Sequence, residues 1–414
     1  MNKLSSIAYY VTDKISSNDI SLSEYVTTDC ILQNKKGREV ASNLPPQPCC
    51  LTRYQRGDIL IANIRPYLKK VWFADIDGGA SSDVLVFRAK EGHSPSFLYA
   101  VLLQDSFFDY VMQGAKGSKM PRGDKEQILR YEMPILSCSE ESIGTFFLNL
   151  DQKIRLNEQI NQNLEAMAKQ LYDYWFMQFD FPNEEGKPYK SSGGEMVWNE
   201  KLKREIPKEW EVLNLGQITT SYQQGLIRSN NQLSDSSEFG YLKMGDLDGK
   251  GQYSLQKLAR TNATSEEVFL FSLHKGDFLI NVRNSKEIVG KTCLIDYVEE
   301  NTLFNHMLVR MSFDKVTSFY MNLLFNTDFM YRAMDGLKQG TTTVIALYQE
   351  DLYRLPIVVP TKNVMDTFSI IEKSILNQKE LLTNEIISLI KQRDELLPLL
   401  MNGQVSVNSD LSDD

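Results

Sequence analysis

Two short stretches of the chain place basic and amide side chains beside an apolar, strand-like segment. They are Asn63, Arg65, Tyr67 and Lys69 after RGDILIA, and Asn281, Arg283, Asn284, Ser285 and Lys286 after KGDFLI. Arg and Asn can donate paired hydrogen bonds to guanine and adenine edges, whereas Lys and Ser commonly contact phosphates. Both stretches therefore predict DNA contact, although any one of these residues is equally consistent with a solvated turn.

Two glycine-rich loops carry donors of the same kind. GAKGSKMPR begins at Gly114 and GLKQGTTTV begins at Gly336, and each follows a helix-like segment. Glycine lets backbone amides approach a duplex closely. A helix cap explains the first glycine of each loop but not the run of donors, so we predict DNA contact here too. The donors are Lys116, Ser118, Lys119 and Arg122, and Lys338, Gln339, Thr341, Thr342 and Thr343.

These candidates belong to an internal repeat. RGDILIANIR matches KGDFLINVRN, and SFLYAVLLQDSFFDYVMQGAKGS from Ser96 matches SFYMNLLFNTDFMYRAMDGLKQG from Ser318. Gln223 and Arg228 in YQQGLIR lie early in the second copy and are further candidates for DNA contact, with a solvated charged run as the alternative. Two copies, each followed by a helix, predict a pseudo-two-fold architecture. Such an architecture suits a bipartite target, and DNA is the commonest of these.

The pattern of short elements predicts an α+β fold for both copies. β-Branched and aromatic runs alternate with Gly, Pro and Asp, and helix-like stretches follow them. Each copy is long enough to bury a core of its own. The predicted segments are a first domain at 1–139, a helix at 140–178, a linker at 179–205, a second domain at 206–361, a helix at 362–402 and a disordered acidic tail at 403–414.

Apolar residues recur every three or four positions in both long helical segments, as in coiled coils. We expect these stripes to pack against each other with the helices antiparallel. Asn157, Asn161 and Gln378 are candidates for the seam, where buried amides fix register; as surface residues they would have no such role. The stripe positions are 143, 147, 150, 154, 160, 164, 167, 171 and 174, with a slip near Asn157, and 371, 375, 382, 386, 389, 396 and 400.

An aromatic cluster ends the first helix and is too rich for an exposed helix terminus. Core packing is the ordinary explanation, and a subunit interface is the alternative that we carry forward. The residues concerned are Tyr172, Tyr174, Trp175, Phe176 and Phe179.

The composition is that of an ordinary globular protein with an acidic balance. Hydrophobic residues make up 42%, charged residues 24%, and the net charge is −9 at pH 7. Proteins that grip phosphates are usually basic. We therefore expect the basic residues to gather on one face, or another subunit to supply phosphate contacts. No apolar run is long enough for a signal peptide or a membrane span, which predicts a cytoplasmic protein.

Motifs for catalysis and cofactor binding are missing from the sequence. VGKT at Val289 lacks the first glycine of a phosphate loop, and neither GxGxxG, GxSxG nor HExxH occurs. Pro45 and Pro46 lack the aromatic neighbour that DNA amino-methyltransferases place beside their target base. The 5 cysteines and 3 histidines show no metal-ligand spacing. We expect reduced thiols, no metal, no cofactor and no catalysis by this chain alone.

Four segments carry a family resemblance: LNEQINQNLEAMAKQLYDYWFMQFDF from Leu156, IPKEWEVLNLGQI from Ile206, NSKEIVGKTCLI from Asn284 and LLPLLMNGQV from Leu396. On these segments the chain resembles the DNA specificity subunits of Type I restriction-modification systems. The resemblance implies two target-recognition domains, each reading half of an asymmetric split site in double-stranded DNA. It also implies two modification (methyltransferase) subunits that bind S-adenosylmethionine, and possibly two restriction subunits that use ATP and magnesium.

We therefore expect a non-catalytic specificity subunit whose paired helices set the distance between two half-sites. One helical turn of DNA is about 10 base pairs, so the unread gap should be about 5 to 8 base pairs. Two alternatives remain, a self-sufficient DNA-modifying enzyme and a coiled-coil scaffold that binds no DNA. A protein mimic of DNA is disfavoured because the acidic residues are dispersed along the chain.

Overall fold

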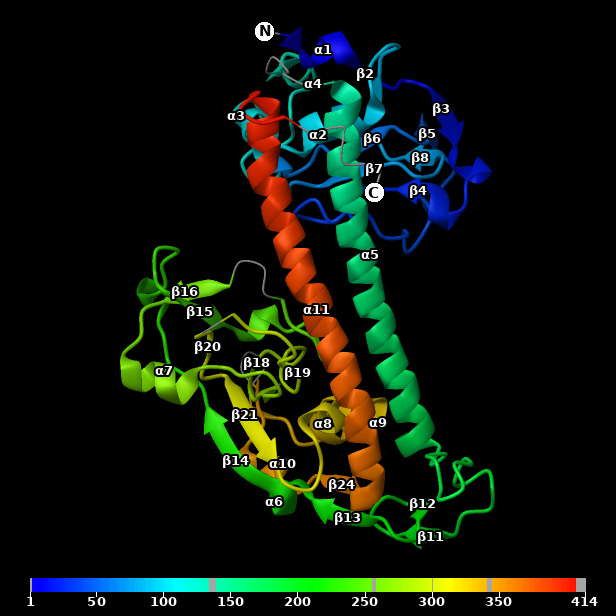
Figure 1. Ribbon diagram of the computed structural model, residues 1–414, viewed down its shortest axis with the longest axis vertical. Coiled ribbons are helices and arrows are strands. Elements are labelled where there is room, and N and C mark those ends of the chain that lie inside the picture. The colour runs from blue at the N-terminus through cyan, green and yellow to red at the C-terminus, as the bar shows by residue number, and fades with distance from the viewer. Residues whose placement is uncertain (1, 134–138, 255–257, 300, 341–344, 407–414) are drawn as a thin grey trace. The chain divides into compact units, whose positions relative to one another are not determined.

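The computed structural model describes residues 2–133, 139–254, 258–299, 301–340 and 345–406 (Figure 1). The chain forms two compact units: unit 1 comprises Met1–Gln159 and Asn384–Asp414, and unit 2 comprises Ile160–Thr383. Two long helices, α5 (Glu140–Tyr172) and α11 (Lys362–Met401), contribute to both units, because the division falls inside each helix. Both units mix helices and sheets, which confirms the predicted fold class.

Unit 1 is built on an antiparallel sheet of four strands in the order β2-β9-β6-β7. These strands are β2 (Ala8–Tyr10), β9 (Val84–Ala89), β6 (Ile59–Ala62) and β7 (Val71–Phe73). Helix α2 (Pro95–Leu103) packs on this sheet, and α3 (Asp105–Gln113) follows it. All four residues of β6 are buried, as is nearly all of α2. Ile59 and Ile61 pack in the core to which α2 belongs, whereas Leu60 packs in a separate core.

The smaller elements of unit 1 flank that core. They are β1 (Asn2–Lys3), α1 (Leu4–Ile7), α4 (Lys125–Ile128) and β10 (Glu132–Met133), a second sheet of β3 (Lys14–Ser16), β5 (Cys50–Tyr54), β8 (Gly78–Ala80) and β4 (Tyr25–Val26), and the 3-10 turns Ser17–Asp19, Leu22–Glu24 and Pro66–Leu68.

Unit 2 repeats this plan with a sheet in the order β14-β21-β17-β19. These strands are β14 (Thr219–Gln224), β21 (Leu308–Phe313), β17 (Phe278–Asn281) and β19 (Thr292–Leu294), followed along the chain by α8 (Ser318–Phe325) and α9 (Asp328–Asp335). Ser94 caps α2 and Thr317 caps α8, each side chain accepting from the backbone amide three residues later. Matching strand order, helices and caps confirm the internal repeat.

The remaining elements of unit 2 are β13 (Glu211–Asn214) paired with β24 (Pro356–Val359), α6 (Leu215–Ile218), α10 (Gln349–Leu352), β15 (Phe239–Leu242), β16 (Ala259–Thr261), β20 (Leu303–Phe304), α7 (Ser265–Phe271), β18 (Arg283–Asn284), β22 (Gln339–Gly340) and β23 (Ile345–Ala346), with a π-helical turn at Asp173–Met177 and 3-10 turns at Asn230–Gln232 and Met244–Asp246. The segment predicted as a linker contains part of a hairpin, β11 (Met196–Asn199) with β12 (Arg204–Pro207).

The long helices are antiparallel within each unit. In unit 1, Asn157 on α5 donates a side-chain hydrogen bond of 2.8 Å to Glu385 on α11. In unit 2, Glu165 on α5 lies 3.0 Å from Lys379 on α11. Later residues of α5 thus meet earlier residues of α11, as predicted. Asn157 is a buried seam residue, whereas Gln378 is exposed and is not.

The predicted stripe on α5 is correct in unit 1 and shifted in unit 2. Ile143 and Phe147 are fully buried in unit 1. In unit 2 the predicted positions Leu164 and Leu171 are partly buried against the core, whereas Met167 is 59% exposed and Ala168 and Tyr172 are buried instead. The turn after α5, Asp173–Met177, is π-helical, and it buries Trp175 and leaves the predicted position Tyr174 39% exposed. No helix in the described part of the chain combines the length and apolarity needed to cross a membrane.

Candidate nucleic-acid interface

Two segments of unit 1 that the sequence nominated separately meet after strand β6. Arg122 forms backbone bridges with both Ile64 and Lys116. The amide of Arg65 donates to the carbonyl of Pro121 over 2.8 Å. A third segment joins them, because the amide of Asn63 donates to the carbonyl of Asp83 over 2.9 Å. We call residues 63–65, 81–83 and 116–123 ladder 1.

Unit 2 builds the same arrangement after strand β17. Arg283 pairs with Ala346, which also pairs with Gln339. The amide of Val282 donates to the carbonyl of Met307 over 3.0 Å, as Asn63 does to Asp83 in unit 1. We call the described residues among 282–286, 305–307 and 339–347 ladder 2.

Backbone bonds set the correspondence between the ladders residue by residue. Gly123 donates to the carbonyl of Asn63 at 3.3 Å, and Leu347 donates to that of Val282 at 2.8 Å. Asn63 therefore corresponds to Val282. The same register makes the following pairs equivalent: Ile64 and Arg283, Arg65 and Asn284, Asp83 and Met307, Lys116 and Gln339, and Arg122 and Ala346.

Ladder 1 presents several polar side chains to solvent. Arg65, Ser118 and Lys119 are exposed, and no side-chain partner of theirs is found among the described residues. Arg65 has a φ of 52°, in the left-handed region that residues other than glycine seldom adopt. Lys116 lies 3.1 Å from Asp124, yet its side chain remains 83% exposed. These groups can donate to an acceptor that approaches from outside.

Two further candidates lie beside ladder 1, and one of them is already engaged in an ion pair. Tyr67 is 48% exposed. Lys69 lies 2.9 Å from Asp105 of α3, a carboxylate that it shares with Lys35. Its charge is therefore already compensated within unit 1.

Ladder 2 presents a smaller set. Arg283 and Lys286 are exposed, and Asn284 and Ser285 are half-buried. Gln339 is exposed but donates to Asp351 over 2.7 Å. Thr341, Thr342 and Thr343 lie outside the described residues.

His306 is a ladder 2 residue that the sequence did not nominate. Burial and the nearby guanidinium of Arg283 lower the pKa of this imidazole, so it is neutral at physiological pH. Its Nδ1 is buried and has no hydrogen-bond partner among the described residues. Only the fold brings His306 beside Arg283, so no local sequence pattern could have found it.

Three predicted contacts in unit 2 are unsuitable because the side chain is buried or already bonded. Asn281 is fully buried in β17, because it still belongs to the strand. Arg228 is paired with Glu267 at 2.7 Å, and its side chain is 10% exposed. Gln223 donates to the carbonyl of Leu270 and accepts from Arg310.

Lys338 is unsuitable for the same reason. Its side chain is 4% exposed, and its ammonium lies 3.1 Å from Asp335 and 3.2 Å from the carbonyl of Lys286. The DNA-contact prediction for Lys338, Asn281, Arg228 and Gln223 is therefore corrected: these side chains stabilise unit 2 and do not extend from it.

Comparison with known proteins gives one consistent result. Residues 207–392 match the family model of the Type I restriction modification DNA specificity domain. The chain is 23% identical to the Type I restriction enzyme MjaIX specificity subunit of Methanocaldococcus jannaschii, over 95% of this chain and 86% of that one. It is also 23% identical to the HindI specificity subunit of Haemophilus influenzae, over 92% and 94% of the respective chains.

The chain is thus similar over nearly its whole length to Type I restriction enzyme specificity subunits. Its fold resembles the crystal structure of the Type I S subunit from M. genitalium, with a TM-score of 0.55 and 14% identity. That alignment covers 98% of this chain and 96% of the other.

The aromatic cluster at the end of α5 is core and not interface. Tyr172, Trp175, Phe176 and Phe179 are each at most 5% exposed and belong to the main core of unit 2. Phe176 packs edge-on against Phe368 of α11 with ring centroids 4.8 Å apart. The interface prediction is therefore wrong for these four residues. These aromatic side chains are buried against α8 and α11, which removes their large apolar area from water.

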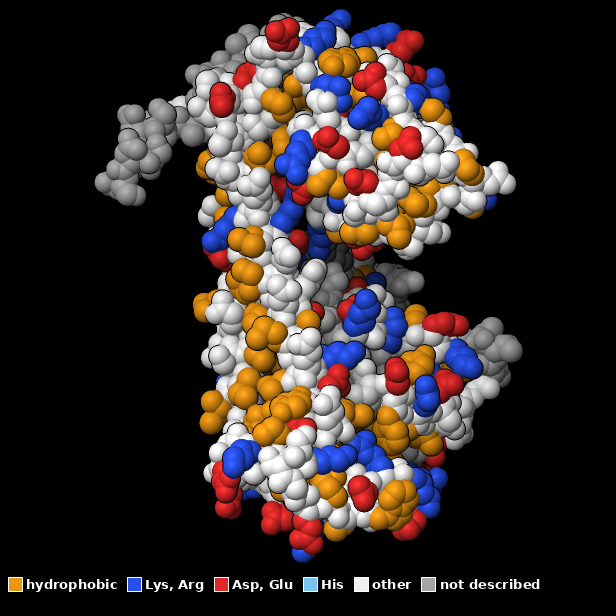
Figure 2. Space-filling model, turned by 90° about the vertical axis from the view of Figure 1, so that its right-hand side faces the viewer, with side chains coloured by type: hydrophobic (Ala, Val, Ile, Leu, Met, Phe, Trp, Pro, Cys, Tyr) orange, Lys and Arg blue, Asp and Glu red, His pale blue; other side chains and the backbone are white. Residues whose placement is uncertain are grey.

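Exposed apolar side chains lie instead elsewhere on the two helices of unit 2. Met167 on α5, Tyr174 on the π-helical turn that follows α5, and Ile370 and Leu381 on α11 are 39–69% exposed. Figure 2 shows hydrophobic side chains gathered over the long helices. Exposed apolar groups that gather in this way are typical of a protein-binding surface.

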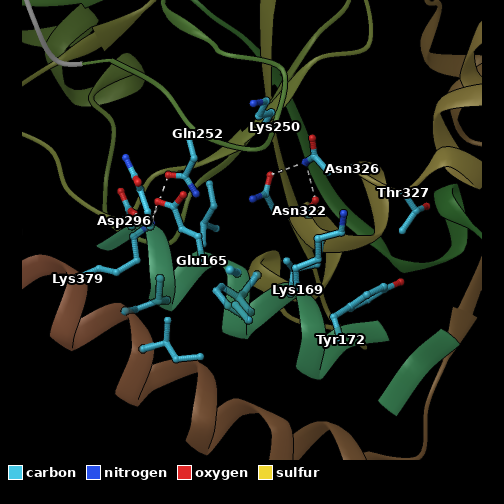
Figure 3. A pocket seen from close by; sticks show the side chains of 18 of the residues that line it. Glu165, Lys169, Tyr172, Lys250, Gln252, Asp296, Asn322, Asn326, Thr327 and Lys379 are labelled. Atoms are coloured by element: carbon cyan, nitrogen blue, oxygen red, sulfur yellow. Dashed lines mark hydrogen bonds and ion pairs between the residues drawn. The ribbon is translucent and has the colours of Figure 1, made fainter. Parts of the chain in front are cut away.

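A cavity of about 460 Å³ in unit 2 opens between α5, α8, α11 and the turn at 249–252 (Figure 3). Lys379 lies at one end with Glu165 at 3.0 Å and Asp296 at 2.5 Å. Burial opposes the charge of Lys379, but the two carboxylates outweigh it and raise its pKa. Asn322 and Asn326 lie together, apart from that group.

The acidic and basic side chains lining this cavity balance, Glu165, Asp173 and Asp296 against Lys169, Lys250 and Lys379. The lining therefore does not favour an anionic ligand such as a phosphate. Instead, the network around Lys379 joins α11 to α5 and to the segment after β19. Within the described residues, no three or more His, Cys, Asp or Glu side chains are grouped to hold a metal ion, and Cys30, Cys49, Cys50 and Cys293 are free thiols.

Proposed function

We propose that this chain is the DNA-reading, non-catalytic subunit of a Type I restriction-modification complex, in which each unit reads one half of a split site in double-stranded DNA. The observation that carries the proposal is the repetition of the ladder. Two units present polar side chains from the same three backbone segments, in the same register. One ladder per half-site is the economical use of such a repeat.

The side chains at the ladders suit DNA. Arg65 and Lys119 in ladder 1 and Arg283 and Lys286 in ladder 2 are exposed cations. Guanidinium groups read base edges and ammonium groups neutralise phosphates. The ladders differ in nearly every equivalent side chain, so the two half-sites should differ in sequence, which makes the whole site asymmetric.

The helices supply the spacing in this proposal. Helix α5 has 33 residues, and a helix rises 1.5 Å per residue, which gives a length of about 50 Å. A rod of that length accommodates one turn of DNA between half-site centres. We propose an unread gap of about 5 to 8 base pairs on this basis.

The partners in this proposal are two modification (methyltransferase) subunits and possibly two restriction subunits. They would bring S-adenosylmethionine, ATP and magnesium and carry out the catalysis. The exposed apolar side chains on α5 and α11 of unit 2 favour such docking. A net charge of −9 favours it as well, because partner subunits would then share the phosphate contacts.

The proposal is tested by purifying the chain with and without its modification subunit. Gel shifts on genomic fragments measure binding, and long-read sequencing of methylated DNA gives the motif. We expect sequence-specific binding and methylation by the complex and no methylation by the chain alone. Methylation by the chain alone would indicate a self-sufficient enzyme. Absence of binding in both preparations would indicate a scaffold.

A further inference from the structure

Asp83 and Arg122 form an ion pair on the outer side of ladder 1. Nη2 of Arg122 lies 3.2 Å from Oδ1 and 3.3 Å from Oδ2 of Asp83. The side chain of Arg122 is 57% exposed and that of Asp83 is 39% exposed, so both can contact an external ligand. An isolated surface pair of this kind contributes about 0 to 1 kcal/mol to stability, which is too little to be its main role here.

The pair is held at both ends by the backbone of ladder 1. Arg122 bridges Ile64 and Lys116, and the carbonyl of Asp83 accepts from Asn63. Only Nη2 of the guanidinium is engaged by Asp83, and Nη1 has no partner among the described residues. Nη2 carries a second hydrogen, so the Nη1/Nη2 edge still offers two adjacent donors. Asp83 thus restricts the rotation of Arg122 while leaving donors and a carboxylate edge accessible. An arginine held in this way loses less side-chain entropy on binding than a free one.

The donor and acceptor pattern of this pair matches one base pair. In the major groove a G·C pair presents two acceptors, N7 and O6 of guanine, followed by the N4 donor of cytosine. Arg122 offers two donors and Asp83 an acceptor, which is the complementary order. An A·T pair instead presents an acceptor, a donor, an acceptor and a methyl group, and places its adenine donor opposite the guanidinium.

Ladder 2 lacks this device at the equivalent positions. Met307 corresponds to Asp83 and Ala346 to Arg122, and neither can donate or accept through its side chain. Whatever the pair reads should therefore appear in one half-site only. The charges of Asp83 and Arg122 cancel. The pair should therefore contribute to base preference and add little to the general attraction for phosphates.

We propose that Asp83 and Arg122 together recognise one G·C base pair in the half-site read by unit 1, with Arg122 contacting guanine and Asp83 both positioning Arg122 and accepting from cytosine. This inference rests on the proposed function and makes Asp83 a specificity-determining residue. Without Asp83, Arg122 would be a mobile cation that could contact any phosphate or base. With Asp83 beside it, Arg122 is oriented to bind one specific base.

The test uses the complex of the full chain with its modification subunit. The variants are Asp83→Ala, Arg122→Ala and the double variant, which leaves the net charge unchanged. The matched control is Glu126→Ala with Arg130→Ala, a surface ion pair of unit 1 outside ladder 1 with 86% and 66% exposed side chains. Binding is measured by competition with duplexes in which each base pair of the wild-type motif is replaced in turn, and thermal unfolding is measured for every variant.

We expect the wild-type complex to discriminate about tenfold or more against A·T at one G·C position of one half-site. The double variant should lose that discrimination, keep every other position of the motif, and keep the wild-type dependence of binding on salt. Asp83→Ala should lose part of it, and the control should lose none.

Unchanged base preference in Arg122→Ala and in the double variant would overturn the inference while leaving the proposed function intact. An equal loss of affinity for all duplexes would overturn the inference as well, because the pair would then contribute to general DNA affinity or to folding. Thermal unfolding of the variants would distinguish these two roles. A wild-type complex without any sequence preference would refute the proposed function itself, and this inference with it.

Discussion

The carboxylate of Asp151 on α5 lies 3.7 Å from the guanidinium of Arg393 on α11, and the two side chains are 2% and 5% exposed, respectively. The hydroxyl of Tyr99 on α2 donates to the same carboxylate at 2.9 Å. In unit 2, Lys379 on α11 meets Glu165 on α5 and Asp296 beyond β19. Each unit thus uses one cation of α11, buried against an acid of α5, to join the helix pair to another segment of the same unit.

Replacing Asp151 should destabilise the chain strongly. Asp151→Ala leaves Arg155 and Arg393 without their shared carboxylate in a buried setting. Breaking a buried pair in this way lowers the free energy of unfolding by about 3 to 5 kcal/mol. Denaturant titration followed by circular dichroism measures the change. The control is Lys391→Ala, whose partner Glu395 is also exposed and which should change stability by less than about 1 kcal/mol. Equal effects for both variants would contradict this view of Asp151.

Replacing Glu372 should stabilise unit 2 at neutral pH. Burial raises the pKa of this carboxyl to about 6, against a hydrogen bond with Thr317 that lowers it. One of its oxygens, Oε2, is buried and finds no hydrogen-bond partner in the described part of the chain. Because the folded pKa exceeds the unfolded value of 4.5, the contribution to stability is complete below that value and is lost as pH rises through about 6. The difference amounts to about 2 kcal/mol at pH 7.

Glu372→Gln should therefore raise the free energy of unfolding by about 1 to 2 kcal/mol at pH 7.5 and leave it unchanged near pH 4. Unfolding curves of the two proteins across this pH range test the prediction. Glu395→Gln, on an exposed part of α11, is the control and should show no such pH dependence. A gain of the same size at both pH values would point to a cause other than ionisation.

The exposed lysines beside the ladders should act on phosphates. Lys119→Ala and Lys286→Ala should each weaken binding of the complex uniformly across DNA sequences and reduce the slope of log K against log salt by about 1. Lys201→Ala, an exposed lysine just after β11, is the control. Competition binding at several salt concentrations measures both quantities. A changed motif with an unchanged slope would instead assign these lysines to base edges.

The exposed apolar side chains on the helices of unit 2 should bind the modification subunit. Met167→Glu should weaken that association by about tenfold or more, because it places a charge in an apolar contact. Phe269 on α7 is 83% exposed and lies on neither long helix, so Phe269→Glu is the matched control. Calorimetric titration with the isolated modification subunit gives both affinities. Similar losses in the two variants would argue against a docking site on α5.

Lengthening both helices should change the spacing of the site and not its half-sites. Inserting four residues after Gln159 in α5 and four after Thr383 in α11 adds about 6 Å to each helix. That length corresponds to about one or two base pairs of DNA. Methylome sequencing should show the same half-sites with a wider gap. Altered half-sites with an unchanged gap would refute the spacing role, and insertion into α11 alone should disrupt the complex because the paired residues no longer match.

The repeat and the paired helices were predictable because their signals are local. The segments RGDILIANIR and KGDFLINVRN predict the strands β6 and β17, and the spacing of apolar residues predicts the helices α5 and α11. The failures at the site have a different origin. Arg228 bonds to Glu267, 39 residues away, and His306 meets Arg283 only through the fold. Whether a cation is exposed or already paired depends on such distant partners, which no window of sequence displays. Likewise the aromatic cluster could not be assigned to core or interface before α8 and α11 were placed against it.

The division of the helices between the units also bears on how the chain is synthesised. Unit 2 is one continuous stretch, Ile160–Thr383. The core of unit 1, in contrast, includes Leu397, Leu400 and Met401 from the far end of α11. During translation, part of the apolar core of unit 1 therefore stays uncovered until the end of α11 has left the ribosome. Unit 2 is translated after the N-terminal part of unit 1, yet it is the first unit that can complete its folding.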